Sequence, residues 1–226
     1  MIKIERIDRS EAFRYLGYKG NAVPDDKINE LADICEKELL AVIQPKLVYR
    51  VFDISENNGD CVRLNGCGFS LDGKDISEHI SGCVKTVLMA CTLSAGTDRV
   101  IRKAEVTDMT KAFIMDAMAS AVTEQVCNAA EEEIFANVTG FFRTWRFSPG
   151  YGDFPIYVQR DFLEILNAPK QIGLCANESS LLTPRKSVTA VIGLSETEIP
   201  RKKRGCGSCR MKDTCAFRRR GDRCEF

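Results

Sequence analysis

The sequence has few features that would place it in a membrane or a secretory pathway. Its longest apolar stretch, near Val87 to Leu93, is seven residues even when Thr92 is counted, whereas a membrane-spanning helix needs roughly 18. The first ten residues, MIKIERIDRS, lack the apolar stretch of a signal peptide. Internal repeats and low-complexity segments are also missing. We therefore expect a cytoplasmic protein without a membrane partner.

The formal net charge is zero, but the charges are unevenly distributed along the chain. Residues 201–226 contain ten Lys and Arg against three acids, which gives +7 and leaves residues 1–200 at −7. The whole chain is 44% hydrophobic and 28% charged, as in typical soluble globular proteins. We therefore predict a globular domain over residues 1–198 and a basic, Cys-rich tail over residues 199–226.

Hydrophobic periodicity predicts both helices and strands in the first unit. Residues 24–45 have helical apolar spacing, and residues 97–138 predict two helices that meet near Thr107-Asp108. The buried stripe predicted on the second helix is Phe113, Ala117, Ala121, Val122, Val126, Ala130 and Ile134. The other predicted segments are strands over 47–54, 61–64, 83–93, 140–147 and 187–194, and a short helix over 158–166. This irregular alternation favours an α+β fold: a mixed, largely antiparallel sheet with flanking helices.

Cysteine is abundant, and four of the eleven cysteines fall in the last 21 residues. An odd number in a reducing compartment argues against a disulfide framework. The four lie in the pattern Cys206-x-x-Cys209-x5-Cys215-x8-Cys224, in a segment too small for its own core. Four unrelated thiols are the alternative, but a tetrathiolate metal site would order this segment. The spacing does not distinguish zinc from an iron–sulfur cluster.

The ten basic residues of the tail are compatible with phosphate contacts to nucleic acid. Aromatic side chains for base stacking are few there, only Phe217 and Phe226. A solvated basic extension that helps docking to an acidic partner surface is favoured over a nucleic-acid partner. A zinc-dependent adaptor remains the third hypothesis for this tail.

The segment Arg146-Phe147-Ser148-Pro149-Gly150-Tyr151 combines residue types that suit a ligand site. Arg146 offers a planar fork for a carboxylate, and Gly150 lets a ligand approach the backbone. Tyr151 adds a stacking face with a hydroxyl group. On these grounds alone a simple Pro-Gly turn is favoured over a binding loop.

The same segment resembles the S-adenosylmethionine-binding Arg-x-x-Pro-Gly-Tyr loop of the activation domain of cobalamin-dependent methionine synthase. The downstream residues 161–166, 172–179 and 184–190 resemble the helix, the Thr-Glu-Ser turn and the Ser-Val stretch that follow the loop in that family. The match runs without gaps over about residues 146–192. Residues 14–18 are more similar to stand-alone members than to the fused domain. The family's closing tyrosine has no counterpart in residues 196–201.

The resemblance implies a ligand site and a role. It implies that S-adenosylmethionine is bound by the Arg146 to Tyr151 loop, by Asp116 on the preceding helix, and by Glu178. From the loop, Arg146, Ser148, Pro149, Gly150 and Tyr151 are the candidate contacts, and no residue is assigned a catalytic role. The implied activity is reductive remethylation of cob(II)alamin in a partner methionine synthase or related corrinoid protein, as a component of that methyltransferase system.

This role implies cofactors that partner proteins would carry or supply. Cobalamin is expected on the partner, because the cobalamin-binding Asp-x-His-x-x-Gly signature is absent and the only histidine, His79, lies in Glu78-His79-Ile80-Ser81-Gly82. An electron donor is also required, which favours an iron–sulfur cluster over zinc at Cys206, Cys209, Cys215 and Cys224. The alternative hypothesis is a non-catalytic redox or metal module whose tail transfers electrons to a corrinoid protein.

Overall fold

The computed structural model describes residues 2–18 and 22–199. The predicted basic tail, including all four of its cysteines, lies outside the described residues. None of the helices in the two described ranges has the length and apolarity needed to cross a bilayer.

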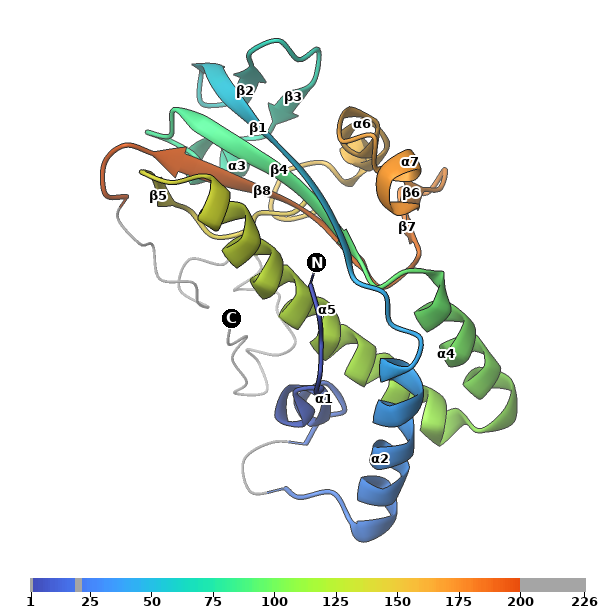
Figure 1. The fold of residues 1–226 in the computed structure, drawn as a ribbon. Coiled ribbons are helices and arrows are strands. Elements are labelled where there is room, and N and C mark those ends of the chain that lie inside the picture. Colours follow the sequence, from blue (N-terminus) through green and yellow to red (C-terminus); the bar gives the residue numbers. More distant parts are fainter. Residues whose placement is uncertain (1, 19–21, 200–226) are drawn as a thin grey trace.

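An antiparallel sheet of six strands forms the centre of the molecule (Figure 1). Its spatial order is β3-β2-β1-β4-β8-β5, and every neighbouring pair is antiparallel. The strands are β1 Lys46–Asn57, β2 Cys61–Leu64, β3 Ser70–Asp72, β4 Lys85–Thr92, β5 Phe142–Arg143 and β8 Ser187–Ser195. The central strand β4 is buried on both faces, which explains its continuous apolar sequence.

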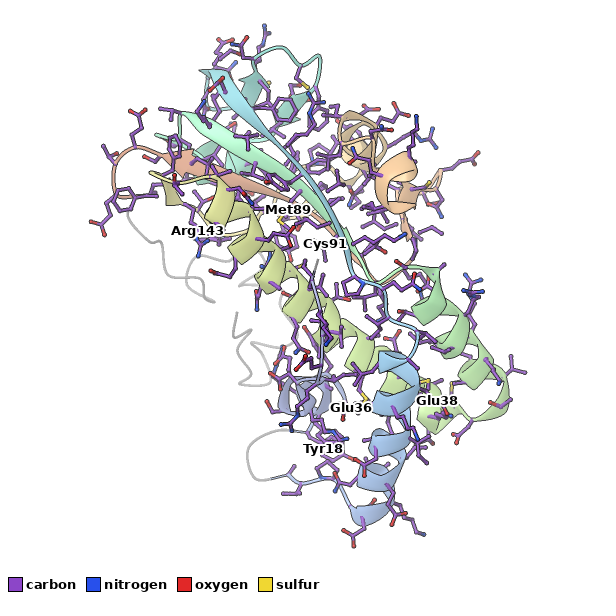
Figure 2. The ribbon with its side chains drawn as sticks, viewed as in Figure 1. Tyr18, Glu36, Glu38, Met89, Cys91 and Arg143 are labelled. Carbon is purple, nitrogen blue, oxygen red and sulfur yellow. The ribbon has the colours of Figure 1, made fainter. Side chains whose placement is uncertain are left out.

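One face of the sheet packs against the 29-residue helix α5 (Met109–Asn137), which crosses it diagonally in Figure 1. Alternate residues of β4, among them Met89 and Cys91 (Figure 2), share a core with apolar residues of α5. Three shorter helices, α1 Arg9–Tyr15, α2 Asp26–Leu40 and α4 Ala95–Thr107, pack against α5. The helix is therefore buried on several sides.

The other face of the sheet carries a second core. Leu88 and Ala90 of β4 point into it, because successive strand residues face opposite sides. It is covered by the short elements that follow β5 in sequence, drawn in orange on the far side of the sheet from α5 in Figure 1. These are the 3-10 helix η1 Ile156–Val158, α6 Gln159–Ile165, α7 Ala168–Ile172 and the hairpin β6 Cys175–Ala176 with β7 Leu182–Thr183, and α3 Lys74–His79 also contributes.

The α+β fold with a largely antiparallel sheet, predicted from the sequence, is confirmed. The junction of two helices near Thr107-Asp108 is also confirmed, because the Asp108 side chain accepts a hydrogen bond from the Lys111 backbone N–H at 3.0 Å and caps α5. The prediction that Phe113 is buried is wrong: it is 64% exposed. Phe113 lies in the second turn of α5, near the end of the helix that extends away from the sheet.

Candidate functional site

Arg146 lies on the outer edge of the sheet, in a segment that continues the line of β5. The Thr144 N–H donates to Gly193 O at 3.0 Å, and Phe147 and Val191 exchange two backbone hydrogen bonds of 2.9 and 2.8 Å. The predicted strand over 140–147 is therefore regular only at Phe142 and Arg143 and otherwise touches β8 at isolated points. These bonds fix the backbone on both sides of Arg146.

The Arg146 guanidinium is held against the C-terminal half of α5. It donates to Asn128 Oδ1 at 3.0 and 3.1 Å and to Glu124 Oε2 at 3.0 Å, and it pairs with Glu131. The side chains of Arg146 and Glu131 are both only 17% exposed, whereas Glu124 is 48% exposed. We call Glu124, Asn128, Glu131 and Arg146 the arginine cluster. Its exposed members are Glu124 and Asn128.

The electrostatics of the arginine cluster keep the guanidinium charged. Burial alone would lower the pKa of Arg146, but its interactions with Cys127, Glu131 and Glu124 outweigh burial and raise the pKa above its ordinary value. The cluster thus contains one fixed cation among carboxylates. Such an arrangement can accept a ligand that carries both an anionic and a cationic group.

The loop after Arg146 is a compact turn that requires glycine. Gly150 has φ +93°, and a Cβ there would lie 3.2 Å from Ile156 Cδ1. The Gly150 N–H donates to Phe154 O at 2.8 Å, and the Tyr151 N–H donates to Ser148 O at 3.0 Å. The loop is therefore held by its own backbone. Pro149 is buried, whereas Gly150 and Tyr151 are exposed.

A reciprocal pair of aspartates fastens this loop to the start of α3. Asp153 accepts from the backbone N–H groups of Lys74 and Asp75 at 3.0 and 2.9 Å, and Asp75 accepts from the Asp153 N–H at 3.1 Å. Asp153 thereby satisfies two N–H groups of the first turn of α3. Gly152, at φ +56°, leaves no room for a Cβ, which would lie 2.0 Å from Asp75 Oδ2.

Aromatic rings line the loop on the face of the sheet opposite the arginine cluster. The Tyr151 ring is 53% exposed and meets Phe147 edge-on at 5.8 Å between centroids. His79 lies against Phe147 at 4.9 Å and Trp145 at 4.6 Å, and its Nε2 lies 2.8 Å from Trp145 O. His79, the lone histidine, thus supports the backbone next to Arg146.

Asp116, the predicted acidic contact, lies further toward the N-terminal end of α5 than the arginine cluster. It pairs with Lys186 Nζ at 2.9 Å, and the same ammonium donates to Asp116 O and to Ser120 Oγ. Eight residues separate Asp116 from Glu124, about 12 Å along the helix axis. The structure therefore does not bring Asp116 and Arg146 together.

Glu178 lies in the turn of the β6–β7 hairpin, and it is exposed. The turn is closed by Asn177, whose side chain accepts from the Leu181 N–H at 2.9 Å. This hairpin packs against the second core, across the sheet from α5. The structure therefore separates Glu178 from the arginine cluster.

No group of three or more potential metal ligands among His, Cys, Asp and Glu occurs within residues 2–18 and 22–199. Seven free cysteines lie in these ranges, and burial raises the pKa of Cys35 and Cys83 to about 11. These two thiols are poor metal ligands, because the thiolate is the form that binds. The predicted metal ligands Cys206, Cys209, Cys215 and Cys224 lie outside the described residues.

Sequence reasoning missed Glu124, Asn128 and Glu131, the partners of Arg146. Their spacing of four and then three residues places them on one face of α5. A polar row at helical spacing within an otherwise apolar helix was the signal that could have identified them. What the sequence did not reveal was that Arg146 faces this row.

Comparison with known proteins gives a clear structural match and no sequence match. No protein-family model matches the chain, and no curated protein matches it. A solved structure described as the MetH reactivation domain bound to AdoHcy matches with a TM-score of 0.61 and 16% sequence identity. The match covers 96% of this chain and 82% of the other. The chain therefore has the fold of the MetH reactivation domain.

Proposed function

We propose that this protein binds S-adenosylmethionine and supports the reductive remethylation of cob(II)alamin in a partner cobalamin-dependent methionine synthase or related corrinoid protein. The observation that carries the proposal is the fold match to a domain described as bound to AdoHcy. The Arg-x-x-Pro-Gly-Tyr segment lies at an exposed sheet edge in this fold. Sequence resemblance and structural similarity thus support the same ligand class.

The arginine cluster suits the amino-acid end of such a ligand. Arg146 provides the planar donor pair that a carboxylate accepts. The exposed carboxylate of Glu124 lies 3.0 Å from Arg146 Nη2 and can accept from the ligand ammonium. A zwitterion can therefore insert between the two side chains and exchange their ion pair for two new ones.

The loop suits the nucleoside end. Gly150 and Tyr151 are exposed, so a planar base can lie over the loop backbone and against the tyrosine ring. Pro149 and the hydrogen bonds of the turn hold this surface in place before a ligand arrives. Ser148 lies between the two ends and is proposed as a further contact. The ligand would then run along the sheet edge.

The contribution of this chain would be positioning. S-adenosylmethionine supplies the methyl group, the partner carries the cobalamin, and an electron donor supplies the electron. The residues of this chain hold the two ends of the ligand, so that its sulfonium lies at the exposed edge in reach of the partner. Asp116 and Glu178 remain proposed contacts that the resemblance implies. Each would have to reach the ligand from a surface other than that of the arginine cluster.

Titration calorimetry with S-adenosylmethionine tests this function. We expect saturable heat with the full chain and binding about 100-fold weaker with Arg146→Ala. Absence of heat with the folded wild-type protein, or unchanged binding by the variant, would contradict the proposal. Circular dichroism of both proteins controls for folding.

A second candidate is a redox or metal module that uses the tail for electron transfer to a corrinoid protein. The four-cysteine spacing in residues 206–224 favours it. Anaerobic purification followed by metal analysis tests it: iron with inorganic sulfide and visible absorption would support it. A colourless protein with stoichiometric zinc would remove it, because zinc has no redox chemistry.

A further inference from the structure

A hollow of about 540 Å³ opens where the C-terminal end of α5 meets β5. Phe142, on the outermost strand of the sheet, is 49% exposed beside it. β5 is the last strand in the sheet order, and it pairs with β8 through two residues. Its outer side is therefore a sheet edge within the described residues. The hollow is lined by Phe135, Val138, Thr139, Gly140, Phe141, Phe142, Arg143, Glu198 and Ile199.

The rim of the hollow carries acidic side chains. Glu198 lines the hollow, and Glu132 borders it through its pair with Arg143, which is a lining residue. Glu131 and Glu133 flank Glu132 in the last two turns of α5. Arg143, labelled in Figure 2, places its guanidinium 4.4 Å from the Phe135 ring centroid and pairs with Glu132 at 3.4 Å. Glu131 is the partner of Arg146, so this rim continues into the arginine cluster.

The chain itself supplies a segment of matching chemistry. The described structure ends in the wall of the hollow at Ile199, and residues 201–226 carry a net charge of +7 against −7 on the rest. That segment also contains two aromatic side chains, Phe217 and Phe226. Opposite charges so closely tethered attract at a high effective concentration.

We propose that the basic tail, residues 201–226, docks in this hollow, with an aromatic side chain inside it and basic side chains on the glutamates of the rim. Cys206 follows Ile199 by seven residues, a reach of at most about 25 Å. The tether therefore keeps Cys206 within that distance of Ile199. The docking requires neither a bound ligand nor the proposed function.

Zero-length carbodiimide cross-linking of the full chain, followed by peptide mass spectrometry, tests the docking. This reagent joins lysine amines to carboxylates in contact. We expect Lys212 to link to Glu132 or Glu133 within one chain, and the yield to fall in 1 M salt, where the screening length is only about 3 Å. Equal linkage to exposed acids elsewhere, such as Glu30 and Glu105, would overturn the proposal.

Two matched variants separate the hollow from general charge attraction. Phe142→Asp should reduce the Lys212 cross-link about fivefold, which corresponds to about 1 kcal/mol. Phe113→Asp changes another exposed aromatic, 64% exposed against 49% for Phe142, near the other end of α5, and should leave the yield unchanged. Equal yields in both variants would overturn the proposal. A mixture of ¹⁴N- and ¹⁵N-labelled protein identifies links between two chains, and a majority of mixed links would also overturn it.

Discussion

Two cations lie against α5, and their surroundings differ. Lys186 is 12% exposed and is held by Asp116 and Ser120, while Arg146 is 17% exposed and is held by Glu124, Asn128 and Glu131. Lys186 lies between the helix and the start of β8, next to Ser187. Arg146 lies beside a glycine loop with an exposed tyrosine. The two cations are therefore similarly buried, but Lys186 contributes to packing, whereas Arg146 belongs to the candidate site.

The largest effect is expected from removing each cation in turn. Arg146→Ala should weaken S-adenosylmethionine binding by about 100-fold, because a charge-assisted pair of hydrogen bonds is lost. Lys186→Ala should leave the affinity within about twofold. Calorimetry measures both. Equal losses in the two variants would remove the distinction between the two cations.

The loop glycines provide the next comparison. Gly150→Ala should lower the affinity by about tenfold and destabilise the protein by roughly 1–2 kcal/mol, because φ is +93° and Ile156 restricts the space for a Cβ. Gly59→Ala, at φ +91° with no atom within 4 Å, should cost similar stability and no affinity. Thermal unfolding and calorimetry separate the two effects. An affinity loss in Gly59→Ala would contradict a local role for Gly150.

The acidic contact can be located by neutral substitutions on α5. Glu124→Gln should weaken binding about fivefold by loss of one charged hydrogen bond. Asp116→Asn should have a smaller effect, because Asp116 faces Lys186. A larger loss in Asp116→Asn would support the assignment from the family resemblance and would require the ligand to extend toward Lys186.

The smallest effect is expected where the loop joins α3. Asp153→Ala should cost about 1 kcal/mol of stability, because two backbone N–H groups of the first turn lose their acceptor. Asp161→Ala, on the exposed first turn of α6, is the matched control. Chemical denaturation measures both, and an equal loss in the control would show that the cross-loop capping contributes nothing.

Sequence patterns predicted the long elements because length makes a pattern distinctive. The two helices that meet at Asp108 repeat their apolar spacing over several turns, and the strand over 83–93 is a continuous apolar run. The family resemblance added the loop at Arg146. The short elements α1, α3 and α7 were missed, because five to seven residues carry little periodicity. The capping of α3 by Asp153 could not be predicted for a different reason. Asp153 lies 78 residues from Asp75 in the sequence, so no local pattern links the two.

The candidate site was predictable only in part. The loop was found from its motif, but the placement of Asp116 depended on register along a helix, and each helical turn moves a residue about 5.4 Å along the axis while keeping it on the same face. The arginine cluster joins Arg146 to three residues of α5. It forms because the Arg146 side chain points toward that helix, a direction that no local sequence pattern predicts. Phe113 was misjudged for a related reason: its neighbours Ala112 and Ile114 are buried, so α5 is covered here on sides other than the one that Phe113 faces.

Amide hydrogen exchange of the full chain with and without saturating AdoHcy locates the ligand site. We expect slower exchange in peptides that cover residues 145–154 and 124–131, with no change over 183–190 and 113–120. Protection confined to the Lys186 region, or no protection anywhere, would contradict the claim that the Arg146 edge is the ligand site.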